Sequence, residues 1–180
     1  MNTPDSSPLT DNEHRHDLLS REAVEKIKEL AAKAETCFFC THLSASQPIQ
    51  TRPMSVQKVD DQGNLWFLSA ADSHKNEEIH SDRFVTLLFQ CSSRSGFLQI
   101  NGTATIARDP ALIDELWDPV AKNWFEKGKE DPRLTIIKVT PADGYYWGNK
   151  HGNTVAGLKM MVGTLLGKNM DDSVEGRLVP

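Results

Sequence analysis

The stretch that decides the fold, residues 49–70, reads IQTRPMSVQKVDDQGNLWFLSA. Its two ends are rich in β-branched, aromatic and apolar residues, which predicts one strand over Ile49–Val59 and another over Asn64–Ala70. Between them, Asp60-Asp61-Gln62-Gly63 is typical turn chemistry. The stretch therefore predicts a β-hairpin.

Further strands are expected on both sides of this hairpin. They cover Cys37–Leu43, Arg83–Cys91, Gly96–Arg108 and Leu134–Thr140, and Gly144–Gly148 is a candidate for a seventh. Because these strands do not alternate with long helices, we expect an α+β fold in which an antiparallel sheet closes into a barrel flanked by short helices. The sequence holds no G-x-G-x-x-G or G-x-x-x-x-G-K pattern, so the usual glycine loops that cradle phosphates are excluded.

Helices are expected where apolar residues recur at helical spacing or where an N-cap residue precedes a proline. These segments are Ser20–Ala34 with Ser20 as its N-cap, Ser73–Ser81, Pro110–Trp117, Pro119–Lys127 and Thr154–Leu166. Residues 1–19 are polar and aperiodic, which predicts a disordered arm. Residues 20–167 would then form one domain and residues 168–180 a C-terminal tail.

The composition excludes several classes of protein. The chain has 180 residues, of which 20 are Lys or Arg and 25 are Asp or Glu, so its net charge of −5 argues against a nucleic-acid-binding protein. No apolar run approaches the roughly 20 residues of a membrane-spanning helix. The first residues also lack the basic and apolar regions of a secretory signal. We therefore expect a cytoplasmic protein with neither a nucleic-acid nor a membrane partner.

The cysteines favour a structural role. Three of them cannot form a closed disulfide framework, which fits a reducing compartment. Cys37 and Cys40 form a C-x-x-C run, but a zinc site needs a second such pair or histidines at ligand spacing. We expect buried structural cysteines and no metal site; the alternative is a redox or metal role for the cysteines.

Two cations flank the hairpin in a pattern that suggests an anion site. Arg52 lies on the first strand, and Ser73 and Lys75 lie at the start of the helix that follows the second. An arginine fork, an ammonium group and the free N–H groups of a helix start together suit a terminal phosphate. The alternative is a solvated helix start with unrelated surface cations. Pro53 removes a backbone donor, which indicates an edge strand or a place where a ligand replaces strand pairing.

The four tryptophans divide into two groups. Trp66, Trp117 and Trp124 fall on apolar faces and are expected in the core. Trp147 follows two tyrosines and precedes a polar loop at residues 149–153. There it could either cover a ligand or pack at a subunit contact.

In several stretches the chain resembles the general stress protein branch of the pyridoxamine 5′-phosphate oxidase-like superfamily, the FMN-binding split barrels. The resembling stretches keep the family's order over about residues 20–150; they are Thr51–Val56, Leu65–Ser69, Ser73–Lys75, Gly102–Ala104, Glu115–Pro119, Trp124-Phe125, Val139–Pro141 and Tyr146-Trp147. The resemblance implies a six-stranded antiparallel split β-barrel. It also implies a homodimer with FMN at the interface between the subunits.

The resemblance further assigns residues to the cofactor. It implies that Arg52 and Lys75 hold the FMN phosphate, with Ser73 and His74 beside it. Along the isoalloxazine ring it places Met54, Ser55, Val56, Leu68 and Ser69, and it brings Trp147 to the cofactor from the partner subunit.

Three departures from the true oxidase argue against pyridoxamine phosphate oxidation. His74 stands where the oxidase has an arginine, and Gln57 stands where it has a substrate-binding lysine. The oxidase's C-terminal Arg-x-His motif has no counterpart in Gly148–Pro180. Two classes of function stay open: a flavin-dependent oxidoreductase, whose chemistry the cofactor carries, and a stress-linked flavin carrier or sensor without turnover.

Overall fold

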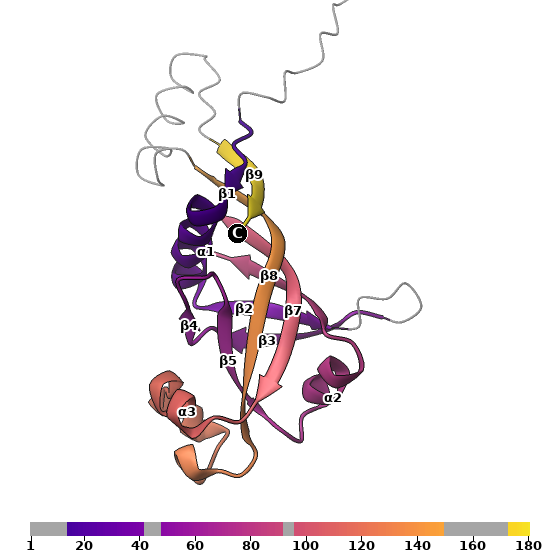
Figure 1. Ribbon diagram of the computed structural model, residues 1–180, viewed down its shortest axis with the longest axis vertical. Helices are drawn as coiled ribbons and strands as arrows, with labels where there is room; N and C mark the ends of the chain where they lie inside the picture. The colour runs from indigo at the N-terminus through magenta and orange to yellow at the C-terminus, as the bar shows by residue number, and fades with distance from the viewer. Residues whose placement is uncertain (1–13, 42–47, 92–95, 150–172) are drawn as a thin grey trace, which may run out of the picture.

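The structure is a computed structural model that describes residues 14–41, 48–91, 96–149 and 173–180 (Figure 1). Over these residues it confirms an α+β architecture, with one nine-stranded sheet flanked by helices. The strands are β1 (Leu18–Leu19), β2 (Thr36–Thr41), β3 (Gln50–Ser55), β4 (Lys58–Val59), β5 (Leu65–Ala70), β6 (Phe84–Gln90), β7 (Phe97–Ala107), β8 (Leu134–Asn149) and β9 (Ser173–Val179). The helices are α1 (Ser20–Ala34), α2 (His74–Ser81) and α3 (Pro110–Leu116), with 3-10 turns η1 (Pro119–Asn123) and η2 (Gly128–Glu130).

The pairing of the strands is consistent with a split barrel. The main path is β1-β9-β8-β7-β6-β2-β3, and β5 pairs off this path with β4 and β8. Only Val56 and Gln57 separate β3 from β4, so the segment 50–59 pairs with β2 at its start and with β5 at its end. The sheet has more strands than the six that the resemblance implies, and the pairing of β1 with β9 is parallel.

One long strand, β8, replaces the two separate segments expected at Leu134–Thr140 and Gly144–Gly148. Its first half pairs with β5 and its second half with β9, while β7 follows it on the other side. Figure 1 shows β7 and β8 running side by side along the molecule. The two halves of β8 therefore have different neighbours.

The predicted hairpin is confirmed as β4 and β5, with Val59 opposite Leu65. The Asp60 carboxylate closes the turn by accepting the backbone N–H groups of Gln62 and Asn64, each at 2.9 Å. Gly63 has a φ of 80°, a left-handed conformation that a glycine adopts without steric cost. Turn chemistry within a few residues therefore fixes the register of this pair.

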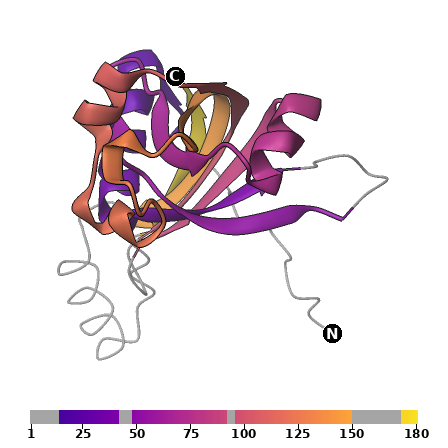
Figure 2. The same cartoon turned by 90° about the horizontal axis from the view of Figure 1, so that it is seen from below.

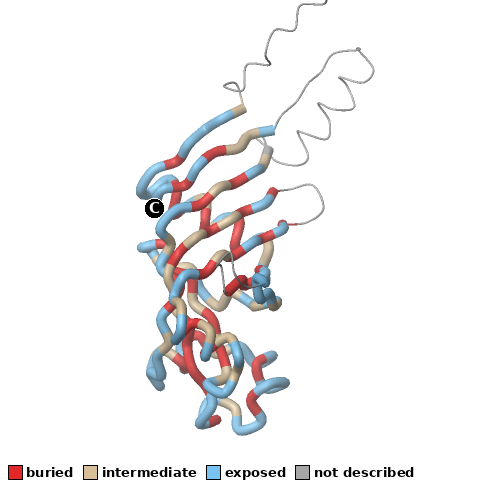
Figure 3. Tube along the Cα trace, turned by 90° about the vertical axis from the view of Figure 1, so that its right-hand side faces the viewer, coloured by how far each residue is buried: buried red, intermediate tan, exposed pale blue. Residues whose placement is uncertain are grey.

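The core lies in two parts. The larger cluster packs α1 against the sheet and includes the fully buried Ile27, Phe39 and Phe67. The smaller cluster lies under α3 and η1, where Ile113 and Phe125 pack with residues of β8. Along the strands, buried and exposed residues alternate, as Figure 3 shows. The smaller cluster holds η1 against the part of the sheet that contains β5 and β8.

The helices match the predicted positions but differ at several ends; α2 begins at His74 and α3 ends at Leu116, one residue short in each case. Helix α1 has the expected bounds, but Leu19 takes the N-cap position and Ser20 does not cap it. Helix α3 is capped by the Asp109 carboxylate as expected. The segment after Pro119 is a short 3-10 turn rather than a helix reaching Lys127. The helix expected at Thr154–Leu166 lies outside the described residues.

Seen from below, α2 stands on one side of the strands while α3 and η1 stand on the other (Figure 2). None of the helices in the described ranges is long and apolar enough to span a membrane.

The two ends of the described chain lie against each other, which differs from the disordered arm and the tail that the sequence predicts. Leu18 pairs with Leu178 in parallel and is buried. The backbone N–H of His16 donates to the Glu175 carbonyl at 2.7 Å. The arm expected over residues 1–19 thus enters the sheet from His14 onward, and residues 173–179 form a strand. Sequence periodicity missed this because β1 has only two residues and pairs with β9, which lies at the other end of the sequence.

Candidate functional site

A cleft of about 350 Å³ opens between β3 and β5, which do not pair with each other in the described part of the chain. Residues from β3, β5, α2 and η1 line it: Arg52, Pro53, Met54, Ser55, Gln57, Leu68, Ser69, Ala70, Lys75, Asp118, Val120, Ala121, Trp124 and Phe125. Its volume lies within the range of about 300–1,000 Å³ that is usual for small-molecule sites. The cleft therefore brings together segments that lie far apart in the sequence.

The sequence of β3 explains why one wall of the cleft is open. β3 is the last strand on the main path, and Pro53 on this strand lies opposite Phe38 of β2. A proline has no N–H group to donate, so it is tolerated on an edge strand. Pro53 thus fits the edge position, and β3 stays unpaired on the side of the cleft.

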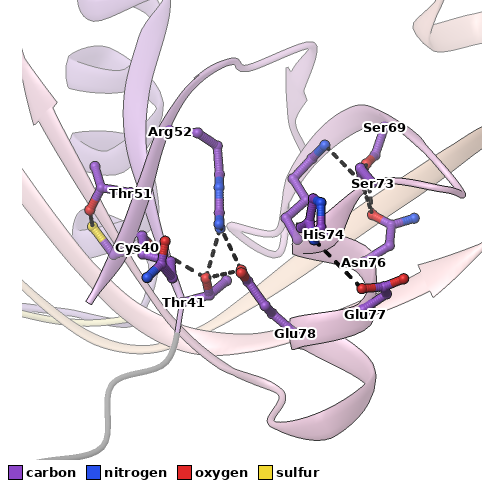
Figure 4. A network of polar contacts seen from close by, with 12 residues as sticks. Cys40, Thr41, Thr51, Arg52, Ser69, Ser73, His74, Asn76, Glu77 and Glu78 are labelled. Carbon is purple, nitrogen blue, oxygen red and sulfur yellow. Dashed lines mark hydrogen bonds and ion pairs between the residues drawn. The ribbon is translucent and has the colours of Figure 1, made fainter. Parts of the chain in front are cut away.

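Arg52 is held by a compact polar network at one end of the cleft (Figure 4). Its Nη1 donates to the Thr41 hydroxyl at 2.7 Å, and its Nη2 donates to the Glu78 carboxylate at 2.7 Å. The Thr41 hydroxyl in turn donates to the same carboxylate. Glu78 lies on α2, so this network fastens α2 to β2 and β3 and fixes the direction of the guanidinium.

Lys75 adds a second cation to the same end. It is half-buried, and its ammonium donates to the Ser73 hydroxyl at 3.2 Å. Burial and the nearby charge of Arg52 lower the pKa of Lys75, and the Glu78 carboxylate only partly opposes them. A lysine in this setting gains from an anion, because an anion offsets both the repulsion by Arg52 and the loss of water.

A second network ties the start of α2 to β5 and β8. The Ser69 hydroxyl donates to the Asn76 side-chain carbonyl at 2.7 Å, and the Asn76 amide donates to Thr135 at 3.1 Å. Thr135 donates onward to the Ser69 carbonyl. Ser69 and Asn76 are almost fully buried, so these bonds are shielded from water. These bonds therefore fix the start of α2, and with it the backbone of Lys75, against β5 and β8.

Six of the residues that the sequence assigns to the cofactor line the cleft: Arg52, Met54, Ser55, Leu68, Ser69 and Lys75. Ser73 lies behind Lys75, where its hydroxyl contacts both Lys75 and Asn76. Four of the predicted residues, Ser73 among them, lie outside the lining.

The other three point elsewhere. The side chain of His74 is 94% exposed and faces Glu77 at 3.8 Å on the outside of α2. Val56 packs against the core, and its N–H donates to the Glu35 carbonyl. Trp147 lies on the second half of β8, opposite Phe97 and 4.7 Å from the ring of Tyr145. The cleft of the same chain therefore gains no contact from the Trp147 side chain.

Sequence reasoning missed the wall formed by η1 and the residue that follows it. Val120 and Trp124 line the cleft with side chains that are 57% and 65% exposed. The expectation that Trp124 belongs to the core is therefore wrong, because Phe125, its neighbour, takes the buried position. Trp66 and Trp117 do pack against the smaller core cluster. Sequence reasoning also missed Thr41 and Glu78, although Glu78 follows Lys75 at the helical spacing that places both on one face.

The cysteines are all buried and free of disulfides. Burial, with a smaller effect of Cys40, raises the pKa of Cys37 to about 12, so its thiolate is strongly disfavoured. Across the described ranges no group of three His, Cys, Asp or Glu side chains could hold a metal ion.

Comparison with known proteins finds curated relatives that match part of the chain. General stress protein 26 of Bacillus subtilis is 31% identical over 78 residues, which cover 42% of this chain and 55% of the relative. Protein bli-3 of Neurospora crassa is 28% identical over 105 residues, 53% of this chain and 50% of the relative. The chain thus spans about half the length of the curated relatives it matches.

Solved structures agree on the fold. A general stress protein 26 structure from a Jannaschia species has a TM-score of 0.73 at 19% identity, covering 88% of this chain and 98% of that one. The general stress FMN/FAD binding protein of Xanthomonas citri is 27% identical with a TM-score of 0.59, covering 70% of this chain and 87% of that one. The model of the family "Pyridoxamine 5'-phosphate oxidase like" matches residues 22–171. The chain therefore belongs to the pyridoxamine 5′-phosphate oxidase-like family, as the sequence motifs predicted.

Proposed function

We propose that this protein binds FMN in the cleft between β3 and β5, with the phosphate at the end formed by Arg52 and Lys75. The observation that carries the proposal is the meeting of these two cations, from separate elements, at one end of a cleft whose other wall is mostly apolar apart from Asp118. A ligand that matches such a cleft has an anionic end and a flat apolar body. FMN has both, and the similar protein from Xanthomonas citri is named for FMN/FAD binding.

The charges near the cations fit a phosphate group. Arg52 is oriented by Thr41 and Glu78 but carries more N–H groups than these two partners use. Lys75 has its pKa lowered by burial and by Arg52, so a bound phosphate would relieve an unfavourable interaction. The first N–H groups of α2 have no partners within the helix and add donors nearby. Ser73 would support Lys75, and His74 would contribute only by turning inward.

The ring of the cofactor would lie along the strands beside this end. Met54 and Ser55 border the cleft from β3, and Leu68 and Ser69 border it from β5. Val56 would reach the ring through its carbonyl group, because its N–H already donates to Glu35. We propose further that β2, β3 with β4, β5, β8, β7 and β6 form the six-stranded antiparallel split barrel of the family.

A homodimer is part of the proposal. The outer face of the sheet exposes large apolar residues that lie opposite one another on neighbouring strands. These pairs are Phe38 with Leu88 and Phe97 with Trp147. Exposed apolar patches of this kind are typical of protein interfaces. A second copy on this face would cover the patch and bring the partner's Trp147 toward the cofactor.

The activity that we propose is that of a flavin-dependent oxidoreductase acting in a stress response. When bound, FMN supplies electron or hydride transfer, so the protein needs no nucleophile of its own. The residues of the chain would bind and orient the cofactor, and the apolar side chains of the cleft would shield its ring from water. Gln57, at the position of the oxidase's substrate-binding lysine, lines the cleft without a positive charge, which favours a substrate other than pyridoxamine phosphate.

Titration of the purified protein with FMN and with riboflavin tests the binding proposal. Charge-assisted hydrogen bonds contribute about 1.5–3 kcal/mol each, so FMN should bind at least tenfold more tightly than riboflavin. Equal affinities would refute the assignment of Arg52 and Lys75, and no binding of either would refute the function. NADH or NADPH is then added to the loaded protein. Bleaching of the flavin supports the oxidoreductase, whereas tight binding without reduction by either supports the carrier or sensor.

A further inference from the structure

The wall of the cleft opposite the cations carries two large apolar side chains that are largely exposed rather than packed in the core. Trp124 and Val120 are 65% and 57% exposed, yet both line the cleft. A tryptophan that serves packing is normally much more buried than this. An exposed indole in a concave site is therefore a candidate contact for a ligand.

The backbone under Trp124 is firmly held. The Trp124 N–H donates to the Ala121 carbonyl at 3.0 Å, and its own carbonyl accepts from Nη2 of Arg133 at 3.3 Å. Arg133 is itself fixed by the buried Asp131 carboxylate at 3.0 Å. Because hydrogen bonds hold both the N–H and the carbonyl group of Trp124, the backbone that carries the indole is fixed in position.

Its neighbours on both sides are anchored as well. The Asp118 carboxylate accepts the N–H of Val120 at 2.9 Å and so caps the 3-10 turn. Phe125 is buried in the smaller core cluster, and its N–H donates to the Ala121 carbonyl. Several polar contacts and the buried Phe125 thus hold η1 in place, while its exposed side chains face the cleft.

The chemistry of the opposite wall indicates what the indole contacts. The cation end of the cleft is suited to an anion, while Leu68, Ala70 and Ala121 join Trp124 and Val120 in the apolar part. An indole and a flat heteroaromatic ring attract each other by stacking and by removal of apolar area from water. We propose that Trp124, with Val120 beside it, forms the ring-binding wall of the chain's own cleft, against which the isoalloxazine of FMN packs.

This inference rests on the proposed FMN binding and goes beyond it, because it assigns an aromatic contact within the same chain. The family resemblance supplies aromatic cover only from the partner's Trp147. With Trp124 in place, one chain would hold both ends of the cofactor, and the partner would complete the site rather than provide its only aromatic contact.

The test compares the full-length chain with Trp124→Ala, Trp124→Phe and Trp117→Phe. Trp117 lies just before the same turn, packs against the smaller core cluster and is no part of the cleft lining, so its variant is a matched control. Four quantities are measured on each protein: FMN affinity, riboflavin affinity, the quenching of tryptophan emission when FMN is added, and the mass of the protein in solution. Thermal unfolding verifies that each variant is folded.

We expect Trp124→Ala to weaken FMN and riboflavin alike by about tenfold, because the ring loses its contact and the phosphate does not. Trp124→Phe should retain most of the affinity and lose a large part of the quenching, while Trp117→Phe keeps both. Unchanged affinity and quenching in the Trp124 variants overturn the inference and leave FMN binding intact. A change of dimer mass without a change of affinity also overturns it, because the indole then belongs to a subunit contact. A wild-type protein that binds neither flavin removes the proposed function, and the inference with it.

Discussion

The two halves of β8 lie in different environments, one polar and charged and the other apolar. The first half pairs with β5 and borders a polar region. Ser69 and Asn76 are buried there, and the cations Arg52 and Lys75 lie nearby. The second half pairs with β9, which in turn pairs with β1. Leu18, Tyr146 and Leu178 are buried there. The first region keeps two like charges close, which costs stability and which the phosphate of the proposed FMN would offset. The second contributes cohesion through apolar burial and backbone hydrogen bonds.

This difference implies that mutations in the two regions have separate consequences. Changes near the cations should alter flavin binding more than the stability of the fold. Changes of the buried apolar residues where β1, β8 and β9 meet should alter stability more than flavin binding, because these strands lie at the other end of β8. The exposed Trp147 is the exception in this region, since we propose that it contacts the cofactor of the partner subunit.

Among single substitutions, the largest effect on stability is expected from Leu18→Ala. Leu18 is 7% exposed, and truncation of a buried leucine costs about 2–4 kcal/mol of the free energy of unfolding. Chemical denaturation measures the loss, and FMN titration of the folded variant should give the wild-type affinity. Leu19→Ala is the matched control, because the neighbouring Leu19 is 61% exposed and its truncation should cost little.

Deletion of residues 1–19 extends the same test, since the sequence predicts a harmless deletion and the structure a destabilising one. A deletion variant with the wild-type free energy of unfolding would show that the start of the chain does not contribute to the fold. Equal losses for the two leucine variants would lead to the same conclusion.

The hairpin and α2 could be predicted because their signals are local. Asp60 and Gly63 define the turn between β4 and β5, and the cations of the cleft follow from the order strand, turn, strand, helix. The resemblance added the family and most of the cleft-lining residues on β3, β5 and α2. The positions of Arg52 and Lys75 at one end of the cleft agree with this prediction.

The pairing of the chain ends could not be predicted, because no local signal joins segments about 160 residues apart. His16 and Gly176 show the difficulty. A Cβ on residue 176 would lie 1.9 Å from the His16 carbonyl oxygen, so this glycine is required by a distant neighbour rather than by a turn. The wall at Trp124 was missed for a related reason. The apolar pattern marks Trp124 and Phe125 alike, and only the tertiary structure decides which one is buried.

The second prediction concerns Lys75→Met, which should weaken FMN binding by about tenfold to a hundredfold through the loss of one charge-assisted contact. The variant should be at least as stable as the wild type without FMN. Burial and Arg52 lower the pKa of Lys75 below that of an unfolded lysine, so carrying this charge at neutral pH costs the folded state stability. Isothermal titration and thermal unfolding measure the two quantities.

Lys75→Arg serves as the control, because it keeps the charge and should retain most of the affinity for FMN. A Met variant that binds FMN as tightly as the wild type would remove Lys75 from the phosphate site. A marked loss of stability in Lys75→Met would instead show that the lysine stabilises the fold. It would also contradict the expectation that changes near the cations affect flavin binding more than stability.

The third prediction concerns Glu78→Gln, which should show the reverse pattern. The Glu78 carboxylate accepts hydrogen bonds from Arg52 and Thr41, and loss of its charge should lower the free energy of unfolding by about 1–3 kcal/mol. Affinity for FMN should rise, because the cation end gains net positive charge while Thr41 still holds Arg52. Glu77→Gln is the control, since Glu77 lies on the exposed side of the same helix with a side chain that is 74% exposed.

A fall in FMN affinity for Glu78→Gln would show that orientation of Arg52 matters more than the charge of the pocket. The ratio of FMN to riboflavin affinity distinguishes this from a general disturbance, because only a change at the phosphate end alters the ratio.

The smallest effect is expected at Asp17, where the two ends of the chain meet. Its carboxylate accepts the backbone N–H of Arg177 at 2.9 Å, and this bond, together with the Arg15 side chain, lowers the pKa of Asp17 below its ordinary value of 3.8. A carboxyl group whose pKa is lower in the folded state stabilises the fold above its unfolded pKa and loses this effect as the pH falls through the folded value. The wild type should therefore lose slightly more stability than Asp17→Asn between about pH 5 and pH 2. Because Asp17 is exposed, we expect the two curves of melting temperature against pH to differ only modestly, and to converge at the acidic end. Parallel curves over this range would show that the contact with Arg177 does not hold the chain ends together, whereas FMN affinity at neutral pH should be the same for both proteins.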